Sequence, residues 1–207
     1  MAILILVRHG ASEWNLLGKW TGLTDVPLAP AGVEEAVCAG QVLKNIQIDI
    51  AYSSPLLRAK ETLEEIKKQK STDIETHIDP ALNEKNYGDF TGKNKWEVKK
   101  QLGEEKFTKV RRSWDYQIPN GESLKNVYER VVPFYEKTIL PGLKKGKSIL
   151  ISSSGNTLRA LIKYLEHISD EDISRLEVAT GEVYMYTLDT NGSIVSKKIF
   201  LSHTNTM

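Results

Sequence analysis

The amino-acid sequence predicts an α/β protein, a three-layer α/β/α sandwich built on a mostly parallel central sheet. Short apolar runs alternate with amphipathic segments along the chain, which is the pattern of strands that alternate with helices. The length of 207 residues favours a single domain over residues 1–207. With 40% hydrophobic and 27% charged residues, the composition is that of a globular domain that buries most of its surface.

In the first half of the chain, strands and helices are predicted in alternation. Ala2–Val7 is a short apolar run that we expect to be a buried first strand, and an irregular segment follows from residue 10 to 28. Pro30 marks the start of a helix, because apolar residues recur at helical spacing from there to Leu43. The next predicted elements are a strand, a helix and a strand, at Ile48–Ser53, Pro55 to about Gln69, and Glu75–Ile78.

The second half of the chain begins with a predicted loop from Leu82 to Gly92. Two long helical segments follow, and we expect the first to break near Gly103 and the second to bend or end at Pro133 and Pro141. They run from Asn94 to about Trp114 and from Gly121 to about Lys145. The remaining predictions are a buried strand, two helices, and two strands joined by a hairpin turn at 189–192, namely Ser148–Ser153, Asn156–Leu165, Asp170–Leu176, Val183–Leu188 and Ile194–Ile199.

The charge and hydropathy of the chain argue against nucleic-acid and membrane partners. The formal net charge is +1, from 28 basic and 27 acidic residues, which provides no general attraction for nucleic acid. No apolar run approaches the roughly 20 residues that span a bilayer. The N-terminus lacks the pattern of a secretory signal. The composition leaves the oligomeric state open, a homo-oligomer included.

The cysteine and histidine residues bear on the compartment and on metal chemistry. Cys38 is the only cysteine, which excludes an intrachain disulfide, so we expect a cytoplasmic protein. Its apolar helical surroundings favour a buried or half-buried side chain over a reactive thiol. The four histidines do not have the spacing of a metal-ligand cluster, so no metal site is predicted from His9, His77, His167 and His203.

Polar residues suited to an anion follow three of the predicted strands. The first strand ends in Arg8-His9-Gly10, and the second ends in Ser53-Ser54 with Arg58 just beyond. The 148–153 strand leads into Ser154-Gly155-Asn156 at the start of a helix. Ligands of open α/β sheets bind beyond the carboxyl ends of the strands, and a helix N-terminus presents free N–H groups to an anion. We therefore expect the two arginines and this helix start to surround one phosphate.

A histidine inside such a ring of positive charge has a chemical use. The neutral imidazole of His9 can attack phosphorus while guanidinium groups neutralise the phosphoryl oxygens, and phosphohistidine is labile enough to pass the group on. The alternative is a histidine that only packs at a strand end. Arg8 argues against that alternative, because arginine rarely ends a buried strand without an anionic partner. Glu84 is a candidate general acid for the leaving oxygen, although by spacing alone it is one glutamate among many.

The ten residues Leu6–Asn15, LVRHGASEWN, resemble the signature of the histidine phosphatase superfamily, and more narrowly that of the cofactor-dependent phosphoglycerate mutases. An Arg-His-Gly run alone is typical of the superfamily, whereas Gly92–Lys95 and Arg111–Ser113 indicate the mutase branch. The resemblance continues in order over nearly the whole chain, in segments 20–28, 53–59, 82–88, 92–95, 111–113, 121–124, 155–161 and 179–181. It implies a phosphoglycerate mutase-like α/β/α fold.

The resemblance also implies a role for each candidate site residue. His9 would carry the phosphoryl group, Arg8 and Arg58 would hold it with Asn15 nearby, and Glu84 would donate and accept the proton. The substrate would be bound by Thr21, Gly22, Tyr87, Lys95, Arg111, Arg112, Gly155 and Asn156. The lysine and the arginine pair would clamp the far end of the substrate, which a plain phosphatase does not need. Without the resemblance, the arginine pair would suit a solvated helix face equally well.

The implied activity is that of a phosphoglycerate mutase, an isomerase of glycolysis and gluconeogenesis that acts on a small-molecule phosphoglycerate. Phosphorylated His9 would donate to 3-phosphoglycerate and give 2,3-bisphosphoglycerate. The bisphosphate would reorient and return a phosphoryl group from its other position, leaving 2-phosphoglycerate. As a cofactor, 2,3-bisphosphoglycerate would also prime the enzyme, and the scheme needs no metal.

Ser154 departs from the family pattern, which has a second histidine just before Gly155-Asn156. That histidine lies beside the transferred group and can offer a charge-assisted hydrogen bond, whereas serine offers a shorter, neutral one. Loss of such a catalytic donor typically costs on the order of 10²–10³ in turnover. Three interpretations compete: an engineered change in an ordinary mutase, a natural and partly compensated residue, or a degenerate member that binds phosphate esters with little turnover.

Two smaller departures bear on water exclusion and on the alternatives. Lys85 stands where the family usually has arginine, and the segment between Ser113 and Gly121 is short compared with the lid of many mutases. A short lid and tail exclude water less well, so we expect relatively more hydrolysis of bisphosphoglycerate. The alternative functions are a phosphomonoester phosphatase that uses the same site and a phosphate-ester-binding protein without efficient turnover.

Overall fold

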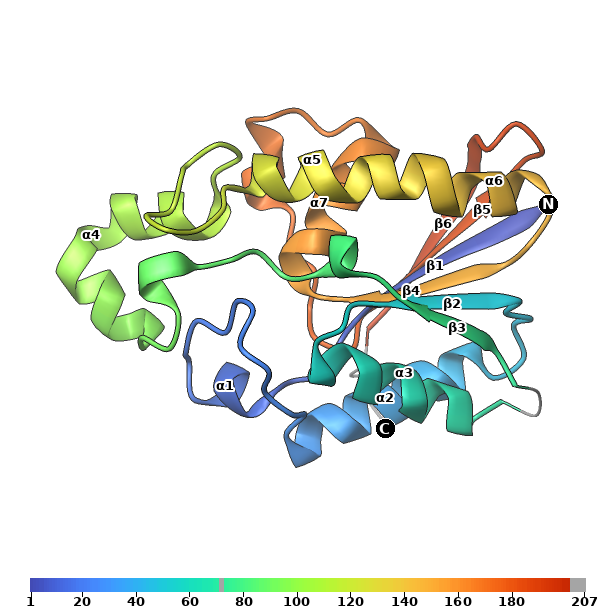
Figure 1. Cartoon of the computed structure of the whole chain (residues 1–207), viewed down its shortest axis with the longest axis horizontal. Helices are drawn as coiled ribbons and strands as arrows, with labels where there is room; N and C mark the ends of the chain where they lie inside the picture. Colours follow the sequence, from blue (N-terminus) through green and yellow to red (C-terminus); the bar gives the residue numbers. More distant parts are fainter. Residues whose placement is uncertain (71–72, 202–207) are drawn as a thin grey trace.

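A computed structural model describes residues 1–70 and 73–201, and a six-stranded mixed sheet lies at its centre (Figure 1). The strand order is β3-β2-β4-β1-β5-β6. The first four of these run parallel, whereas β5 is antiparallel to both β1 and β6. The strands are β1 (Ala2–Arg8), β2 (Ile50–Ser53), β3 (Glu75–Ile78), β4 (Ile149–Ser153), β5 (Val183–Leu188) and β6 (Ile194–Phe200). The predicted strands and the mostly parallel sheet are confirmed, with small shifts at the strand ends.

Helices cover both faces of this sheet. The helices α2 (Pro30–Leu43) and α3 (Leu57–Lys68) lie on one face, below the sheet in Figure 1. The helices α5 (Leu124–Phe134), α6 (Leu140–Lys144) and α7 (Gly155–Glu166) lie on the other face. The predicted three-layer α/β/α sandwich is therefore confirmed.

Two hydrophobic clusters fill the space between the layers, and the alternation of side chains along β1 separates them. Leu4 and Leu6 pack with α5 and α7, whereas Ile5 and Val7 pack with α2 and α3. All four side chains are fully buried. Because the central strands are covered on both faces, they are continuous apolar runs in the sequence.

The remaining helices lie beyond the carboxyl ends of the parallel strands, at the left of Figure 1. They are α1 (Glu13–Leu16) and α4 (Lys95–Arg112), together with a 3₁₀ turn at Gly88–Phe90. As predicted, α4 is interrupted at Gly103, whose φ of 77° lies in the left-handed region that favours glycine. This end of the sheet has its own small apolar cluster around Trp20.

Three elements differ from the prediction. The sequence pattern does not predict α1, a four-residue helix that depends on a reciprocal cap between Ser12 and Asn15. The helix predicted over 121–145 divides near Pro133 and Pro141, as expected, into α5 and α6, but the segment between them is a π-helical turn at Tyr135–Ile139. The helix predicted at 170–176 is only a 3₁₀ turn, because the carbonyl of Ile173 accepts from Leu176 N three residues on and from Arg159 Nη2.

The expected half-buried environment of Cys38 is confirmed, and this thiol lies on α2. Within the described ranges, no helix combines the length and apolar character needed to cross a membrane. His203 and the rest of the tail from residue 202 lie outside the described residues.

Candidate active site

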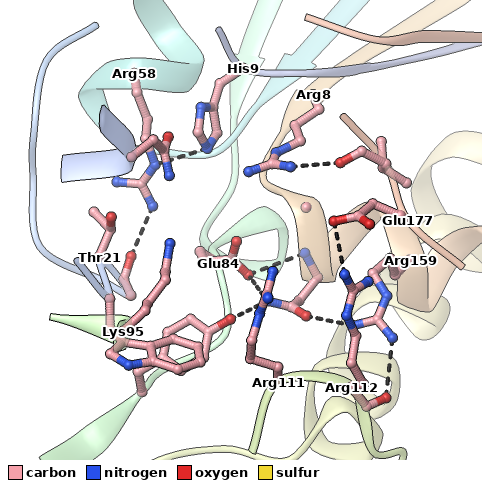
Figure 2. A pocket seen from close by; sticks show the side chains of 17 residues that line it. Arg8, His9, Thr21, Arg58, Glu84, Lys95, Arg111, Arg112, Arg159 and Glu177 are labelled. Carbon is pink, nitrogen blue, oxygen red and sulfur yellow. Dashed lines mark hydrogen bonds and ion pairs between the residues drawn. The ribbon is translucent and has the colours of Figure 1, made fainter. Parts of the chain in front are cut away.

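A pocket with about 660 Å³ of open space lies beyond the ends of β1 and β4 (Figure 2). Every predicted site residue except Ser154 lines it, namely Arg8, His9, Asn15, Thr21, Gly22, Arg58, Glu84, Tyr87, Lys95, Arg111, Arg112, Gly155 and Asn156. Its remaining lining residues are Trp20, Arg159, Glu177 and Val178. The sheet topology therefore brings together residues that are almost 150 positions apart in the sequence.

The pocket is strongly cationic, although the whole chain is almost neutral with a net charge of +1. Six arginine and lysine side chains line it, against the two carboxylates of Glu84 and Glu177. Several of its donors are also buried without a hydrogen-bond partner in the described part of the chain, including Arg8 Nε and Thr21 Oγ1. Unsatisfied buried donors and excess positive charge suit a ligand with several negative charges.

His9 presents one ring nitrogen to this pocket as an acceptor. Its Nδ1 lies 2.7 Å from Gly10 O, and since a carbonyl oxygen only accepts, Nδ1 carries the proton and Nε2 keeps its lone pair. Burial lowers the pKa of His9 well below its ordinary value, and the charges of Arg58 and Arg8 lower it further. The imidazole is therefore neutral at physiological pH, with Nε2 available as a nucleophile.

The two arginines nearest His9 are held in different ways. Arg58 Nε donates to His9 Nε2 at 3.2 Å, and its terminal nitrogens donate to Gly22 O and Thr24 O. Arg8 Nη1 donates to Val178 O at 2.6 Å, whereas its buried Nε has no partner among the described residues. A side chain at Gly155 would press on Arg8, because a Cβ built there lies 3.3 Å from Arg8 Nε. The small residue keeps this guanidinium accessible beside the start of α7.

Glu84 accepts hydrogen bonds from three donors at the same oxygen, and two of these donors belong to Asn156 on α7. Its Oε1 accepts from Lys85 N at 2.6 Å, from Asn156 N at 3.3 Å and from Asn156 Nδ2 at 3.0 Å. Asn156 Nδ2 also donates to the hydroxyl of Tyr87 at 2.8 Å. No hydrogen bond to Oε2 occurs within the described ranges, so this oxygen is left for a ligand or a proton.

The predicted cationic clamp lies on the opposite wall from His9 in Figure 2. Lys95 begins α4 and lies over the ring of Trp20 at 5.7 Å, while Arg111 and Arg112 end the same helix. Burial, together with Arg111 and Arg8, lowers the pKa of Lys95 to about 8. Both ends of α4 therefore contribute positive charge to one end of the pocket.

Arg159 and Glu177 line the pocket, but sequence reasoning gave them no role. Arg159 Nη1 donates to Asn156 Oδ1 at 2.9 Å, and its Nη2 donates to Ile173 O and Arg112 O. The carboxylate of Glu177 lies 2.8 Å from Arg112 Nη2. Arg159 lies inside the 155–161 segment that resembles the family, so the sequence could have identified it as a candidate. No local pattern marks Glu177.

Ser154 is completely buried at the N-cap of α7 and does not line the pocket. Its side chain makes no capping hydrogen bond, and its hydroxyl has no partner in the described part of the chain. The short side chain thus leaves the position of the family histidine without a donor that lines the pocket. Whether Ser154 contributes to catalysis stays a prediction.

Lys85 is buried directly behind the pocket wall and does not line it. Its Nζ donates to Val110 O at 3.0 Å and lies 4.8 Å from the ring centre of Tyr87. Burial, assisted by the charge of Arg159, lowers the pKa of Lys85 to about 7. The residue that replaces the usual arginine therefore supports Tyr87 and the end of α4 from behind.

The sequence profile of the histidine phosphatase superfamily, branch 1, matches residues 4–199 of this chain. The 2,3-bisphosphoglycerate-dependent phosphoglycerate mutase of Cytophaga hutchinsonii is 47% identical over 186 residues, which are 90% of this chain and 87% of that protein. The protein of the same name from Parvibaculum lavamentivorans is 44% identical over 96% of both chains. The phosphoglycerate mutase of Schizosaccharomyces pombe is 44% identical over 95% of both.

Solved structures agree with these sequence comparisons. YhfR of Bacillus stearothermophilus is similar with a TM-score of 0.83 and 25% identity, over 94% of both chains. The α-ribazole phosphatase of Shigella flexneri is similar with a TM-score of 0.78 and 25% identity, over 96% of this chain and 95% of that chain. The family profile, the relatives and the shared fold lead to one conclusion: the chain belongs to branch 1 of the histidine phosphatase superfamily and is a member of its phosphoglycerate mutase group.

Proposed function

We propose that the protein is a 2,3-bisphosphoglycerate-dependent phosphoglycerate mutase that interconverts 3-phosphoglycerate and 2-phosphoglycerate. The observation that carries this proposal is a neutral nucleophilic histidine in a pocket with a second, separate cationic end. His9 Nε2 faces Arg58, and Lys95, Arg111 and Arg112 line the far end of the same pocket. The names of the relatives support the same activity.

His9 Nε2 is the proposed acceptor of the phosphoryl group. Its lone pair now accepts from Arg58 Nε, so attack on phosphorus requires this N–H to turn to a phosphoryl oxygen as the N–P bond forms. The protonated Nδ1 stays hydrogen-bonded to Gly10 O and fixes the ring. Arg8 Nε and the N-terminus of α7 supply further donors for the same phosphate.

Glu84 is the proposed proton carrier. When the phosphoryl group leaves a substrate oxygen, the carboxylic acid form of Glu84 donates a proton to that oxygen; in the return step the carboxylate takes it back. The three donors on Oε1 hold the group in one orientation and leave Oε2 to exchange the proton. Asn156 thus holds the proton carrier directly, and Tyr87, which accepts from the same Asn156 amide, lines the pocket beside it.

The pocket residues also fit 2,3-bisphosphoglycerate, which supplies the phosphoryl group that first loads His9. This ligand has phosphates on two neighbouring carbons and a carboxylate bonded to the carbon that bears one of them, and the pocket has cations at both ends. Among the described residues, buried donors without a partner occur on Arg8, beside His9, and on two other lining residues, Thr21 and Arg159. Side chains of Lys95, Arg111 and Arg112 hold the second phosphate and the carboxylate in this proposal.

Three further expectations belong to the same proposal. We infer one domain over residues 1–207, since strands from both ends of the chain pair within one sheet. A cytoplasmic location is supported by the single cysteine and by the central metabolic substrate. A small phosphoglycerate is the only partner that the proposal requires, the scheme uses no metal, and a homo-oligomer is compatible with it.

The test is a coupled assay for conversion of 3-phosphoglycerate into 2-phosphoglycerate, with and without 2,3-bisphosphoglycerate. We expect interconversion that depends on the bisphosphate, and mass spectrometry should find one phosphate on His9. Release of inorganic phosphate without interconversion would indicate a phosphatase instead. Absence of a phosphate on His9 would indicate a protein that only binds phosphate esters.

A further inference from the structure

Glu177 places a carboxylate in a pocket that is otherwise lined mainly by cations. The backbone around it is held from two sides, because Arg112 Nη1 donates to Leu176 O at 3.4 Å and Arg8 Nη1 donates to Val178 O at 2.6 Å. The side chain reaches back over the pocket, where it lies 2.8 Å from Arg112 Nη2 (Figure 2). The carboxylate therefore has a defined place on the wall between two arginines of the proposed site.

This carboxylate is charged at neutral pH and faces open space. Partial burial raises the pKa of Glu177, but the charges of Arg112, Arg111 and Arg8 outweigh that effect and leave the pKa below its ordinary value. Its side chain is 63% exposed, compared with 21% for Arg112. A surface ion pair of this kind contributes little to stability, so its location in the pocket is of more interest than its strength.

A fixed negative charge in an anion-binding pocket repels each ligand in proportion to the charge of that ligand. 2,3-Bisphosphoglycerate has one phosphate more than 3-phosphoglycerate, which adds about 1.5 to 2 negative charges at neutral pH. Glu177 also occupies one N–H of Arg112 that could otherwise donate to a ligand oxygen. Both effects weaken the binding of the bisphosphate more than that of the monophosphate.

We propose that Glu177 is a specificity-determining residue that lowers the affinity of the pocket for bisphosphate ligands relative to monophosphate ligands. The inference rests on the proposed mutase function, in which both kinds of ligand occupy one pocket. With Glu177 in place, the bisphosphate dissociates more readily, and a higher concentration of it is needed to load His9. Neutralising this one carboxylate shifts the pocket toward retention of the bisphosphate.

The test measures binding by calorimetry in a His9→Asn background, in which neither ligand can react at position 9. At low salt, we expect addition of Glu177→Gln to lower the Kd of 2,3-bisphosphoglycerate by roughly tenfold, and that of 3-phosphoglycerate, which carries about three fifths of the charge, by about fourfold. The difference should shrink in about 0.5 M KCl, because salt screens exposed charges. If Glu177 only supported the fold, its replacement would change the two Kd values by the same factor, whatever the charge of the ligand.

Two control variants separate this effect from other consequences of mutation. Glu177→Asp keeps the negative charge, so the ratio of the two Kd values should stay within about 1.3-fold of the parent, against about 2.5-fold for Glu177→Gln. Glu34→Gln removes the same charge from an exposed position on α2 that does not line the pocket, and should leave the ratio unchanged. Equal shifts for both ligands, weaker binding of both, or no shift with Glu177→Gln would each overturn the inference.

The binding test of Glu177 and the coupled mutase assay can fail independently of each other. A chain that fails to interconvert phosphoglycerates but shows the expected change in the Kd ratio would contradict the proposed function and leave the role of Glu177 standing. Interconversion by the unmodified chain, combined with an unshifted ratio, would contradict only the role of Glu177.

Discussion

The Ser154 hydroxyl is buried at the start of α7, has no partner among the described residues and does not line the pocket. We therefore expect Ser154→Ala to keep kcat within about twofold, since the hydroxyl gives no hydrogen bond to lose. The free energy of unfolding should be unchanged or higher by up to about 1 kcal/mol, because an unsatisfied polar group is removed. Steady-state kinetics and urea denaturation measure both, and a tenfold loss of kcat would mean that the hydroxyl reaches the substrate.

The same position offers a gain-of-function test. Ser154→His restores the donor of the family pattern beside Gly155, and kcat should rise by at least about tenfold, toward the 10²–10³ range typical of such donors. Ser154→Asn is a suitable control, because it adds polar volume without a basic ring. If the histidine variant is no faster than the control, this position does not limit the chemistry.

The lowered pKa of His9 predicts a specific dependence of stability on pH. Below about pH 6.5 the unfolded chain protonates this imidazole, whereas the folded chain does so only at a much lower pH. The unfolded state then binds more protons, so the free energy of unfolding falls as the pH drops, by at most about 1.4 kcal/mol per pH unit. Urea denaturation from pH 7 to 5 should show this loss in the wild type relative to His9→Asn. Parallel profiles for the two proteins would contradict the neutral, buried state of His9.

At the scale of elements, Arg159 joins α7 to the end of α4 and to the 3₁₀ turn at Asp172–Arg175. It donates to three carbonyl oxygens, on the Asn156 side chain, Arg112 and Ile173. Arg159→Met removes this donor from all three acceptors, of which, within the described part of the chain, only Ile173 O keeps another, from Leu176 N, and should lower the free energy of unfolding by about 3 kcal/mol. It should also lower kcat, because the side-chain amide of Asn156, which holds Glu84, can then rotate.

The control for this prediction is Arg175→Met, at an arginine with an 84% exposed side chain that pairs with Asp172 on the surface. That change should cost less than about 1 kcal/mol and leave kcat unaffected. Urea denaturation and the coupled assay provide the two readouts. Similar losses in the two variants would mean that Arg159 acts only as a surface charge.

The elements that the sequence predicts well are those with a strong local pattern. Apolar runs such as Ala2–Val7 identify the strands because both faces of the sheet are covered, and Gly103 identifies the break in α4. The short α1 depends on its reciprocal cap, and the π-helical turn at Tyr135–Ile139 places Tyr135 and Ile139 in the core, so neither shows the apolar periodicity of the longer elements. Arg159 looks like any basic residue of an amphipathic helix until the fold buries it, and only folding brings Glu177 to the pocket.

At the scale of the whole molecule, positive charge is concentrated in the pocket while the net charge is +1. Inorganic phosphate should therefore bind the folded chain and raise its stability, by about 2.7 kcal/mol at 100 times its Kd. For a protein of this size that corresponds to a rise in Tm of roughly 5–10 °C. Thermal unfolding in phosphate, compared with chloride at the same ionic strength, measures the effect. An equal Tm in the two salts would contradict an anion-binding pocket.

The strand order has a consequence for how the molecule is made. β4 lies between β1 and β2, yet the ribosome synthesises it about a hundred residues after β2. A nascent chain that ends before residue 149 has β1 and β2 but not the strand that joins them, so the central sheet cannot close until most of the protein has been translated. Such long-range pairing slows folding and leaves apolar strands exposed in the meantime. The pocket around His9 therefore cannot form until Gly155 and Asn156 have been synthesised. Until then the apolar strands of the N-terminal half are the part of the chain that most needs protection from aggregation.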